Sequence, residues 1–268
     1  MICFPNGKIN LGLQVLSKRS DGFHNIESLI YPIPLKDVLE FVPAKSFQFD
    51  ISGMAISGNK KDNLIWKAWE LLKREFKLPP LHVHLHKAIP TGSGMGGGSA
   101  DAAFFLRESN EFFKLGMNDN KMKSLAGLLG SDCPFFIENK PAFVSGKGEI
   151  LQSATINLRG KYLLIIMPET HISSQKAYSL VQPEKPDVSL SEIISKPISQ
   201  WKNLLKNDFE KPIFSLYPEL GNLKKSLYEN GAVYASMTGS GSAIYGLFEN
   251  EPVLKDINPN NYLWSGKL

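Results

Sequence analysis

Cysteine is scarce in this sequence, and its two thiols stand far apart. Cys3 and Cys133 are the two cysteines among 268 residues, and they form no CxxC pair. The sequence therefore supports neither a disulfide framework nor a thiolate zinc site, while a single disulfide between the two remains an open alternative.

Long apolar runs and a secretory leader are also missing. A membrane-spanning helix needs about 20 mostly apolar residues, and no run in the chain approaches that length. The opening residues, MICFPNGKINLGL, contain no basic segment followed by an apolar stretch of signal-peptide length. Together with the few cysteines, these absences predict a soluble, reduced, cytoplasmic protein without a membrane partner.

Charge of one sign is not concentrated anywhere. The formal net charge is +4, and the lysines are spread along the chain without forming an arm or a tail. This distribution argues against a nucleic-acid partner, because such proteins usually gather their basic residues in a patch or stripe. Hydrophobic residues make up 43% of the chain, which is enough to build the core of one large domain or two modest ones.

The periodicity of apolar residues predicts a mixture of strands and helices without regular βα alternation, which favours an α+β fold. A glycine is expected to end each of two helices, at Gly130 and at Gly231, and a domain boundary is expected between residues 1–158 and 159–268. The predicted strands cover 36–43, 47–52, 79–90, 161–168, 232–237 and 243–248. The predicted helices cover 62–76, 122–129, 175–181, 190–195, 198–206 and 217–230, and a further helix after the glycine run has Ala102, Leu106 and Phe113 on one side.

Five glycines crowd the segment IPTGSGMGGGSADAA, between a predicted strand and a predicted helix. Glycine lets the backbone approach an anion closely and adopt positive φ. The free N–H groups at a helix start can then point at a phosphate, helped by the helix dipole. A tight strand–helix turn is the alternative, but it needs only one or two glycines, so the run predicts a phosphate-binding loop.

Three familiar nucleotide loops fit this run poorly. The GxxxxGK[ST] pattern of P-loops is absent. Gly92, Gly94 and Gly97 satisfy GxGxxG, but no acidic residue follows at a strand end about 20 residues later, as a dinucleotide site requires. Ser99 stands where a protein-kinase glycine loop has valine, and no HRD or DFG follows.

The run PTGSGMGGGSADAA instead resembles the Pro-x-Gly-x-Gly loop of the GHMP kinases, and MTGSGSAIYGLF at 237–248 resembles their late glycine motif. The stretches GKINLGLQVLSKRSDGFHNIES, GGGSADAA, LGSDCPFF and NDFEKPIFSLYPEL resemble one family among them, the 4-diphosphocytidyl-2-C-methyl-D-erythritol kinases. The departures are Gly7 for the usual alanine, Ser99–Ala100 for a Ser–Ser pair, and Phe23 for tyrosine. None of them removes a charged group.

The resemblance implies a two-domain α+β GHMP kinase fold. It would have an N-terminal ribosomal-S5-domain-2-like ATP domain, a C-terminal ferredoxin-like substrate domain, and the active site between them. It also implies ATP with Mg²⁺ as cofactors and a cytidine-diphosphate-linked methylerythritol as the substrate, phosphorylated on its 2-hydroxyl. A monomer or weak homodimer is expected.

Phosphoryl transfer to an alcohol needs a base near the hydroxyl and a cation that stabilises the developing charge. Asp132 in GSDCP is the candidate base, although turn and capping aspartates are common. Lys8 in NGKINLGL is either an edge residue that reaches solvent or an inward charge with a purpose. The resemblance favours catalytic roles for both Lys8 and Asp132.

Other site residues follow from the resemblance. On chemistry alone Phe23 could be a core side chain and His24 a surface one, whereas the family uses this pair to hold cytosine. Ser99 could bind the metal, but no firm metal ligand is assigned. The expected ATP-binding residues are Pro90, Thr91, Gly92, Ser93, Gly94, Met95, Gly96, Gly97, Gly98, Ser99 and Ala100, and the expected substrate-binding residues are Asn10, Phe23, His24, Ser174, Tyr178, Gly239, Ser240 and Gly241.

Two other functions stay open. A homoserine or mevalonate kinase would keep the loop and lack the cytosine site, and a non-catalytic nucleotide-binding protein would lack the Lys–Asp pair. His82, His84 and His86 lie on one face of a predicted strand, opposite three apolar residues. This alternation is expected to make them an exposed polar face and not a metal site.

Overall fold

The computed structural model describes residues 1–253 and 258–268. Contacts divide the chain into two compact units, each built from three separate segments, so the units alternate along the sequence. The sequence boundary expected after residue 158 stays a prediction. The first unit contains Met1–Gly7, Leu35–Thr91 and Gly96–Lys140, and the second contains Lys8–Pro34, Gly92–Met95 and Pro141–Leu268.

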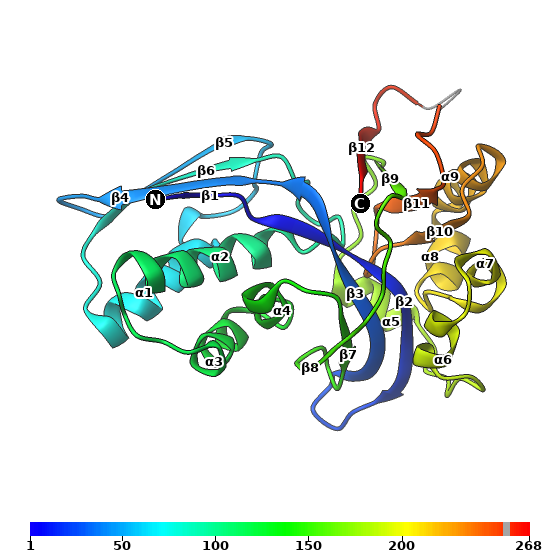
Figure 1. The fold of residues 1–268 in the computed structure, drawn as a ribbon, viewed down its shortest axis with the longest axis horizontal. Helices are drawn as coiled ribbons and strands as arrows, with labels where there is room; N and C mark the ends of the chain where they lie inside the picture. Colours follow the sequence, from blue (N-terminus) through cyan, green and yellow to red (C-terminus); the bar gives the residue numbers. More distant parts are fainter. Residues whose placement is uncertain (254–257) are drawn as a thin grey trace. The chain divides into compact units, whose positions relative to one another are not determined.

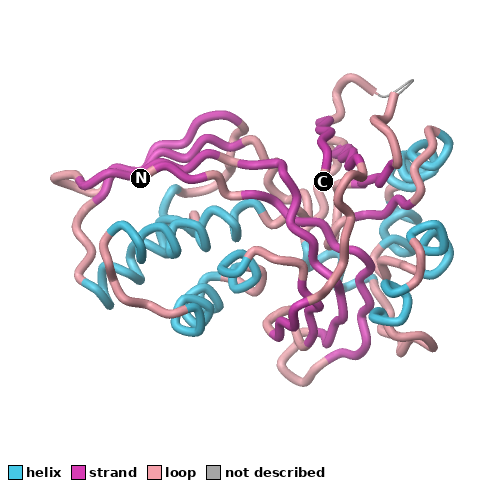
Figure 2. The backbone as a smooth tube through the Cα atoms, viewed as in Figure 1, coloured by secondary structure: helices cyan, strands magenta, loops and turns pink. Residues whose placement is uncertain are grey.

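The first unit is a four-stranded sheet with helices on one face (Figures 1 and 2). The strand order is β1-β4-β6-β5, with β5 parallel to β6 and the other two pairings antiparallel. Its elements are β1 (Ile2–Cys3), β4 (Val38–Pro43), β5 (Gln48–Gly53), η1 (Lys60–Asp62), α1 (Leu64–Phe76), β6 (Leu81–Lys87), α2 (Gly97–Phe112), α3 (Asp119–Leu129) and α4 (Cys133–Glu138).

Strand β6 shows why this sheet forms. Leu81, Val83 and Leu85 are fully buried, while His84 and His86 face solvent, as the strict alternation predicts. On the neighbouring strand, the Phe41 ring packs edge-on against Phe105 of α2, and Trp69 of α1 is a core residue as expected.

Two predicted helix ends are wrong in detail. Asp62 closes the short η1, and α1 begins at Leu64 because the Asn63 side chain caps it by accepting a hydrogen bond from Ile65 N. Gly130 follows α3, but its φ is 176°, which is extended backbone and not the left-handed conformation of a capping glycine. Gly231, with φ 92°, does follow α9 in the left-handed region as predicted.

The second unit contains two four-stranded sheets, β2-β3-β7-β8 and β10-β11-β9-β12, with helices beside the latter (Figure 1). The pairings of β9 with β11 and β12, and of β10 with β11, are antiparallel, as an α+β fold implies. Its elements are β2 (Asn6–Lys18), β3 (His24–Lys36), β7 (Ala142–Ser145), β8 (Ile150–Ser153), β9 (Tyr162–Met167), α5 (Ser174–Leu180), α6 (Leu190–Ser195), η2 (Ile198–Gln200), α7 (Trp201–Leu204), α8 (Glu210–Leu216), α9 (Pro218–Glu229), β10 (Tyr234–Met237), β11 (Ile244–Phe248) and β12 (Tyr262–Lys267).

One apolar core joins the two sheets of the second unit. Leu13 and Val15 of β2 pack in the same cluster as Ile166 of β9, Ile213 of α8 and Leu227 of α9. Strand β9 is buried on both faces, which its continuous apolar run predicts. This shared core fixes β2 against the elements that carry the late glycine motif.

The two cysteines are both free and buried, so they form no disulfide. Within residues 1–253 and 258–268, no helix combines the length and the apolar character that crossing a bilayer requires.

Candidate active site

Strand β2 carries the candidate lysine and asparagine on one face. Lys8 and Asn10 are each 4% exposed, so Lys8 is an inward charge and does not reach solvent. The Lys8 Nζ donates a 2.6 Å hydrogen bond to Asn10 Oδ1. The Asn10 Nδ2 donates to Ser28 Oγ at 2.8 Å, and this hydroxyl donates to Gly12 O. The two side chains are therefore held in a buried polar network.

Both glycine motifs contribute backbone beside these residues in the second unit. Lys8 N donates to Met95 O at 2.9 Å, and Ala243 N donates to Ser93 O at 3.3 Å. Gly94 has φ +77°, and a Cβ added there would lie 2.1 Å from Thr238 O. Position 94 therefore requires glycine for its conformation and for the close approach of the late loop.

Thr238 connects the late loop to β2. Its hydroxyl accepts from Asn10 N at 3.2 Å and lies within 3.3 Å of Asn10 Oδ1 and 3.2 Å of Gly94 O. The Tyr245 hydroxyl donates to Asn10 O at 2.7 Å. Burial raises the pKa of Tyr245 well above its usual value, so this hydroxyl stays protonated as a donor.

The rest of the first glycine run opens α2 in the first unit. Gly96 is the N-cap residue with φ 70°, and Gly97 and Gly98 form the first turn. A Cβ on Gly98 would meet nothing within 4 Å among the described atoms. The first N–H groups of a helix have no partner within the helix. The first turn of α2 therefore presents N–H groups beside small residues, an arrangement suited to an anion.

Asp132 stands at the N-cap of α4 in the first unit, half-buried, with φ −83° and ψ −15°. Its side chain makes no capping hydrogen bond to α4, all of whose residues the structure describes. A capping role therefore does not account for this aspartate. Lys8, the other candidate catalytic residue, belongs to the second unit.

The segment that carries Asp132 packs against the start of α2. A Cβ added at Gly130 would lie 3.4 Å from Cys133 Sγ and 3.9 Å from Ser99 Oγ. Burial raises the pKa of Cys133 to about 12, so it remains a thiol and is not a nucleophile. Asp132 is therefore positioned next to the helix turn that suits a phosphate.

A buried charged cluster that the sequence analysis missed anchors both ends of the glycine run in the first unit. The Lys87 ammonium contacts Asp37 and donates to Asp101 Oδ2 at 2.8 Å. The other carboxylate oxygen of Asp37 accepts from Ala88 N at 2.7 Å and from Ile89 N at 2.8 Å. The end of β6, which leads into the run, is thereby joined to α2, which follows it.

The charges in this cluster compensate one another. Burial alone lowers the pKa of Lys87, but the carboxylates of Asp101 and Asp37 outweigh it, and the net shift is upward. Burial raises the pKa of Asp101 to about 8 against the opposing effect of the Lys87 ammonium. The cluster therefore keeps a charged lysine in the protein interior.

We expect Lys87→Met to destabilise the protein by about 3–5 kcal/mol, because it leaves two carboxyl groups buried without their cation. The measurement is the denaturant midpoint of unfolding. Lys121→Met is the matched control, since Lys121 pairs with Glu75 on the surface, and such pairs contribute less than about 1 kcal/mol. Equal midpoints for the two variants would contradict a structural role for the cluster.

The structure brings two of the three predicted cytosine-binding side chains together. The rings of His24 and Tyr178 stack with centroids 5.1 Å apart and an interplanar angle of 22°. Burial, and then the Lys18 ammonium, lowers the pKa of His24, so the imidazole is neutral near pH 7. Phe23 is 56% exposed beneath the Lys147 ammonium, so the alternative of a core phenylalanine is wrong.

Ser174 and Ser240 also meet, with their hydroxyl oxygens 3.0 Å apart. Ser174 is the first residue of α5, the helix that carries Tyr178, and Ser240 lies in the late loop with Gly239 and Gly241. The start of α5 therefore adjoins the late glycine motif within the second unit.

A pocket of about 410 Å³ in the first unit lies next to the strand that leads into the glycine run. Met54 N donates to Lys87 O at 2.9 Å, which fixes the end of β5 beside the end of β6. Ile51, Met54, Ile56 and Asn63 are among the residues that line it. The sequence analysis missed this pocket because no motif marks the turn from 54 to 59.

The histidine row on β6 has ordinary surface partners. His82 Nε2 contacts Asp50 at 2.8 Å, and Ser52 Oγ lies 2.9 Å from His84 and 3.0 Å from His86. No group of three or more metal-binding side chains occurs among the residues that the structure describes.

Comparison with protein families gives two matches along the chain. Residues 63–140 match the GHMP kinases N terminal domain, and residues 189–257 match the GHMP kinases C terminal family. The first match spans the glycine run and Asp132, and the second spans the late glycine motif.

Several relatives are similar over nearly their whole length. A protein of Bacteroides fragilis (strain YCH46) named 4-diphosphocytidyl-2-C-methyl-D-erythritol kinase is 49% identical over 94% of this chain and 93% of its own. A protein of Cytophaga hutchinsonii with the same name is 45% identical over 97% of each chain.

Solved structures of GHMP kinases also have folds similar to that of this chain. A crystal structure of 4-(cytidine 5'-diphospho)-2C-methyl-D-erythritol kinase superposes with a TM-score of 0.80 and 29% identity, covering 92% of this chain and 90% of that one. Homoserine kinase from Cytophaga hutchinsonii superposes with a TM-score of 0.60 at 15% identity over 92% of this chain and 85% of that one. The homoserine kinase shares the fold alone.

Proposed function

This chain belongs to the 4-diphosphocytidyl-2-C-methyl-D-erythritol kinases of the GHMP kinase superfamily, and from that premise we propose how its residues perform the reaction. The reaction transfers the γ-phosphoryl group of ATP to the 2-hydroxyl of 4-diphosphocytidyl-2-C-methyl-D-erythritol, giving ADP and the 2-phosphate. It belongs to the non-mevalonate route to isoprenoid precursors.

ATP is held by the first glycine run, residues 90–100, with its phosphates at the first turn of α2. The free N–H groups of that turn and the positive end of the helix dipole favour a phosphate there. The adenine ring occupies the pocket formed by residues 51–63. The apolar side chains of Ile51, Met54 and Ile56 suit a flat base, and the amide of Asn63 offers hydrogen bonds.

The Asp132 carboxylate acts as the general base. It accepts the proton of the 2-hydroxyl while the hydroxyl oxygen forms its bond to the γ-phosphorus and the bond to the ADP oxygen breaks. Its half-buried position at the N-cap of α4, next to Ser99 and the first turn of α2, supports this role.

The Lys8 ammonium stabilises the same acceptor oxygen and the transferring phosphoryl group. A preorganised cation in a water-poor site is worth more than one in solution. The burial of Lys8 and its 2.6 Å hydrogen bond to Asn10 support the proposal, because they hold the ammonium in one position. Asn10 and the late loop residues Gly239, Ser240 and Gly241 contact the substrate.

Magnesium would accompany bound ATP and would neutralise charge on the phosphates. Hard cations of this size keep phosphate and water ligands, so they need few protein oxygens. The Ser99 hydroxyl, in the first turn of α2, would be one protein oxygen available to it, and no firm metal ligand is assigned.

The cytidine end of the substrate is held by Phe23, His24 and Tyr178, with Ser174 nearby. A cytosine ring stacks on an aromatic face, and the neutral imidazole of His24 both donates and accepts a hydrogen bond at the base edge. The contact between His24 and Tyr178 supports this assignment. A cytoplasmic location and a monomer or weak homodimer remain part of the proposal.

The observation that carries the proposal is the meeting of Lys8, Asn10 and both glycine motifs within one unit. The test is a coupled ADP-release assay with a panel of alcohols. We expect turnover with the cytidyl methylerythritol substrate and little with homoserine or mevalonate. Equal or faster turnover of homoserine or mevalonate would overturn the substrate assignment, and no ADP release with any alcohol would favour a non-catalytic nucleotide-binding protein.

A further inference from the structure

The segment between α7 and α8 has no role so far, although it begins the motif NDFEKPIFSLYPEL. It lies along β2, the strand that carries Lys8 and Asn10. Leu13 N donates to Lys206 O at 2.9 Å, and Asp208 N donates to Leu13 O at 2.9 Å. The Asp208 carboxylate also accepts from Val15 N at 2.7 Å. The residues on both sides of Asn207, Lys206 and Asp208, are therefore hydrogen-bonded to β2.

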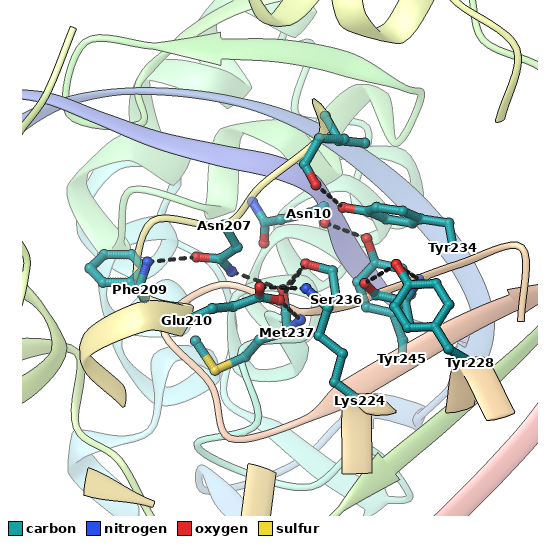
Figure 3. Close-up of polar contacts among 12 residues, drawn as sticks. Asn10, Asn207, Phe209, Glu210, Lys224, Tyr228, Tyr234, Ser236, Met237 and Tyr245 are labelled. Carbon is teal, nitrogen blue, oxygen red and sulfur yellow. Dashed lines mark hydrogen bonds and ion pairs between the residues drawn. The ribbon is translucent and has the colours of Figure 1, made fainter. Parts of the chain in front are cut away.

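The side chain of Asn207, within this segment, bridges two residues of the late glycine loop. It is 3% exposed, and its Nδ2 donates to Met237 O and to Gly239 O, both at 2.8 Å. Its Oδ1 accepts from Phe209 N at 3.0 Å. Both amide protons and the carbonyl oxygen are thus used, and Figure 3 draws the bonds to Met237 and Phe209. One side chain fixes the carbonyl groups on both sides of Thr238.

Glu210 fixes the entry to the same loop. Its Oε1 accepts from Ser236 Oγ at 2.9 Å and from Met237 N at 2.8 Å, and its Oε2 accepts from Lys224 Nζ at 2.5 Å (Figure 3). The residue is 9% exposed. A buried carboxylate that accepts three hydrogen bonds holds its donors strongly, because charge-assisted bonds are about twice as strong as neutral ones.

The position of the loop decides what its residues touch. Thr238, between the two carbonyls that Asn207 holds, contacts Asn10 and Gly94. A Cβ on Gly239 would lie 3.6 Å from Lys8 Nζ. A shift of the loop along β2 would therefore change the surroundings of the Lys8 ammonium and would displace the loop residues that are proposed to contact the substrate.

We propose that Asn207 and Glu210 are positioning residues for phosphoryl transfer: they hold the late glycine loop in the register that places it against Lys8 and Asn10. The role rests on the proposed kinase function. Loss of either residue is expected to slow the chemical step, because misplacement of reacting groups by about 1 Å can cost 10²-fold in rate.

Asn207→Asp keeps the size of the side chain and replaces the donor with a carboxylate oxygen that faces two carbonyls. We expect kcat, per folded molecule, to fall by about 10²-fold, with a much smaller change in the KM for ATP. Circular dichroism gives the folded fraction at the assay temperature. Asn230→Asp is the matched control, because it loses a similar bond, from Nδ2 to Ser226 O at the end of α9.

A second pair of variants, at Glu210, separates the effect of the position of its carboxylate from the effect of its charge. This test stands even if the Asn207→Asp protein does not fold. Glu210→Gln keeps the length and an acceptor for Ser236 and Met237, and loses the charge opposite Lys224. Glu210→Asp keeps the charge and withdraws the carboxylate by one methylene. We expect Glu210→Gln to keep most of its kcat and Glu210→Asp to lose at least about tenfold.

The outcomes distinguish this role from simpler ones. A folded Asn207→Asp protein with the wild-type kcat would overturn the proposal. A higher kcat for Glu210→Asp than for Glu210→Gln would also overturn it, since that order indicates that the charge of Glu210, and not its position against the loop, supports turnover. All rates use the alcohol that the wild-type protein turns over best. If the wild-type protein turns over none, the kinase function itself has failed, whereas equal rates for wild type and variants reject only the positioning role.

Discussion

Asp132→Asn is expected to lower kcat by about 10³-fold, which lies within the range that a general base contributes. The amide has the same shape as the carboxylate but cannot accept the proton of the 2-hydroxyl at neutral pH. The substitution keeps the volume of this half-buried side chain, so the protein should fold and bind ATP nearly as the wild type does. Steady-state kinetics and nucleotide titration measure the two effects.

Asp119→Asn is the matched control, since Asp119 is an exposed residue in the first turn of α3, in the same unit. It should leave kcat unchanged. A near-normal rate for Asp132→Asn would remove Asp132 from the role of base. A large loss of ATP affinity would instead assign it to nucleotide binding.

Gly94→Ala should have a comparably large effect for a different reason. A methyl group at this position would lie 2.1 Å from Thr238 O, and the backbone has φ +77°. Because the obstacle is a backbone carbonyl, no side-chain rotation relieves the contact, and the two glycine loops must move apart. We expect kcat/KM for ATP to fall by at least about 10²-fold, since displacement of such a loop misaligns the phosphates.

Gly116→Ala separates the steric effect from the conformational one. Gly116 has φ +72°, but a Cβ there would meet nothing within 4 Å of the described atoms. This control should lose about 1 kcal/mol of stability, the cost of a non-glycine residue in the left-handed region, and keep its kcat/KM. If both variants keep full activity, the close approach of the loops is not required for turnover.

Local patterns predicted much of the fold. The alternation in LHVHLHK placed β6 and its buried face correctly, and the apolar run in KYLLIIM placed β9 as a strand buried on both faces. These patterns succeed because burial on a strand or helix face is decided by neighbours a few residues apart. Strands β1, β3, β7, β8 and β12 were missed. Four of them are short or only partly buried, whereas β3 is long but contains Pro32 and Pro34, which disfavour a strand.

The buried cluster of Lys87 could have been found from the same alternation. Lys87 follows Leu81, Val83 and Leu85 at even spacing, so a strand places it inward. An inward lysine needs buried carboxylates, since an unpaired buried charge is costly. Which carboxylates they are depends on tertiary contacts, because Asp37 is 50 residues away along the chain and Asp101 lies on another element.

The candidate site was likewise only partly predictable from the sequence. The glycine motifs and the resemblance indicated the loops, Lys8 and Asp132 from the sequence. The sequence could not show that Asn207 holds the carbonyls of Met237 and Gly239, about 30 residues later. Such long-range pairs depend on how β2 and the late loop pack, and no local pattern encodes that.

We propose above that Lys8 and Asp132 act on one acceptor oxygen. A crystal structure with a non-hydrolysable ATP analogue and 4-diphosphocytidyl-2-C-methyl-D-erythritol tests it most directly. We expect the 2-hydroxyl oxygen to lie about 2.6–3.2 Å from an Asp132 carboxylate oxygen, about 3–3.5 Å from the γ-phosphorus, and in contact with the Lys8 ammonium. A bound substrate whose 2-hydroxyl lies out of reach of both side chains would contradict it.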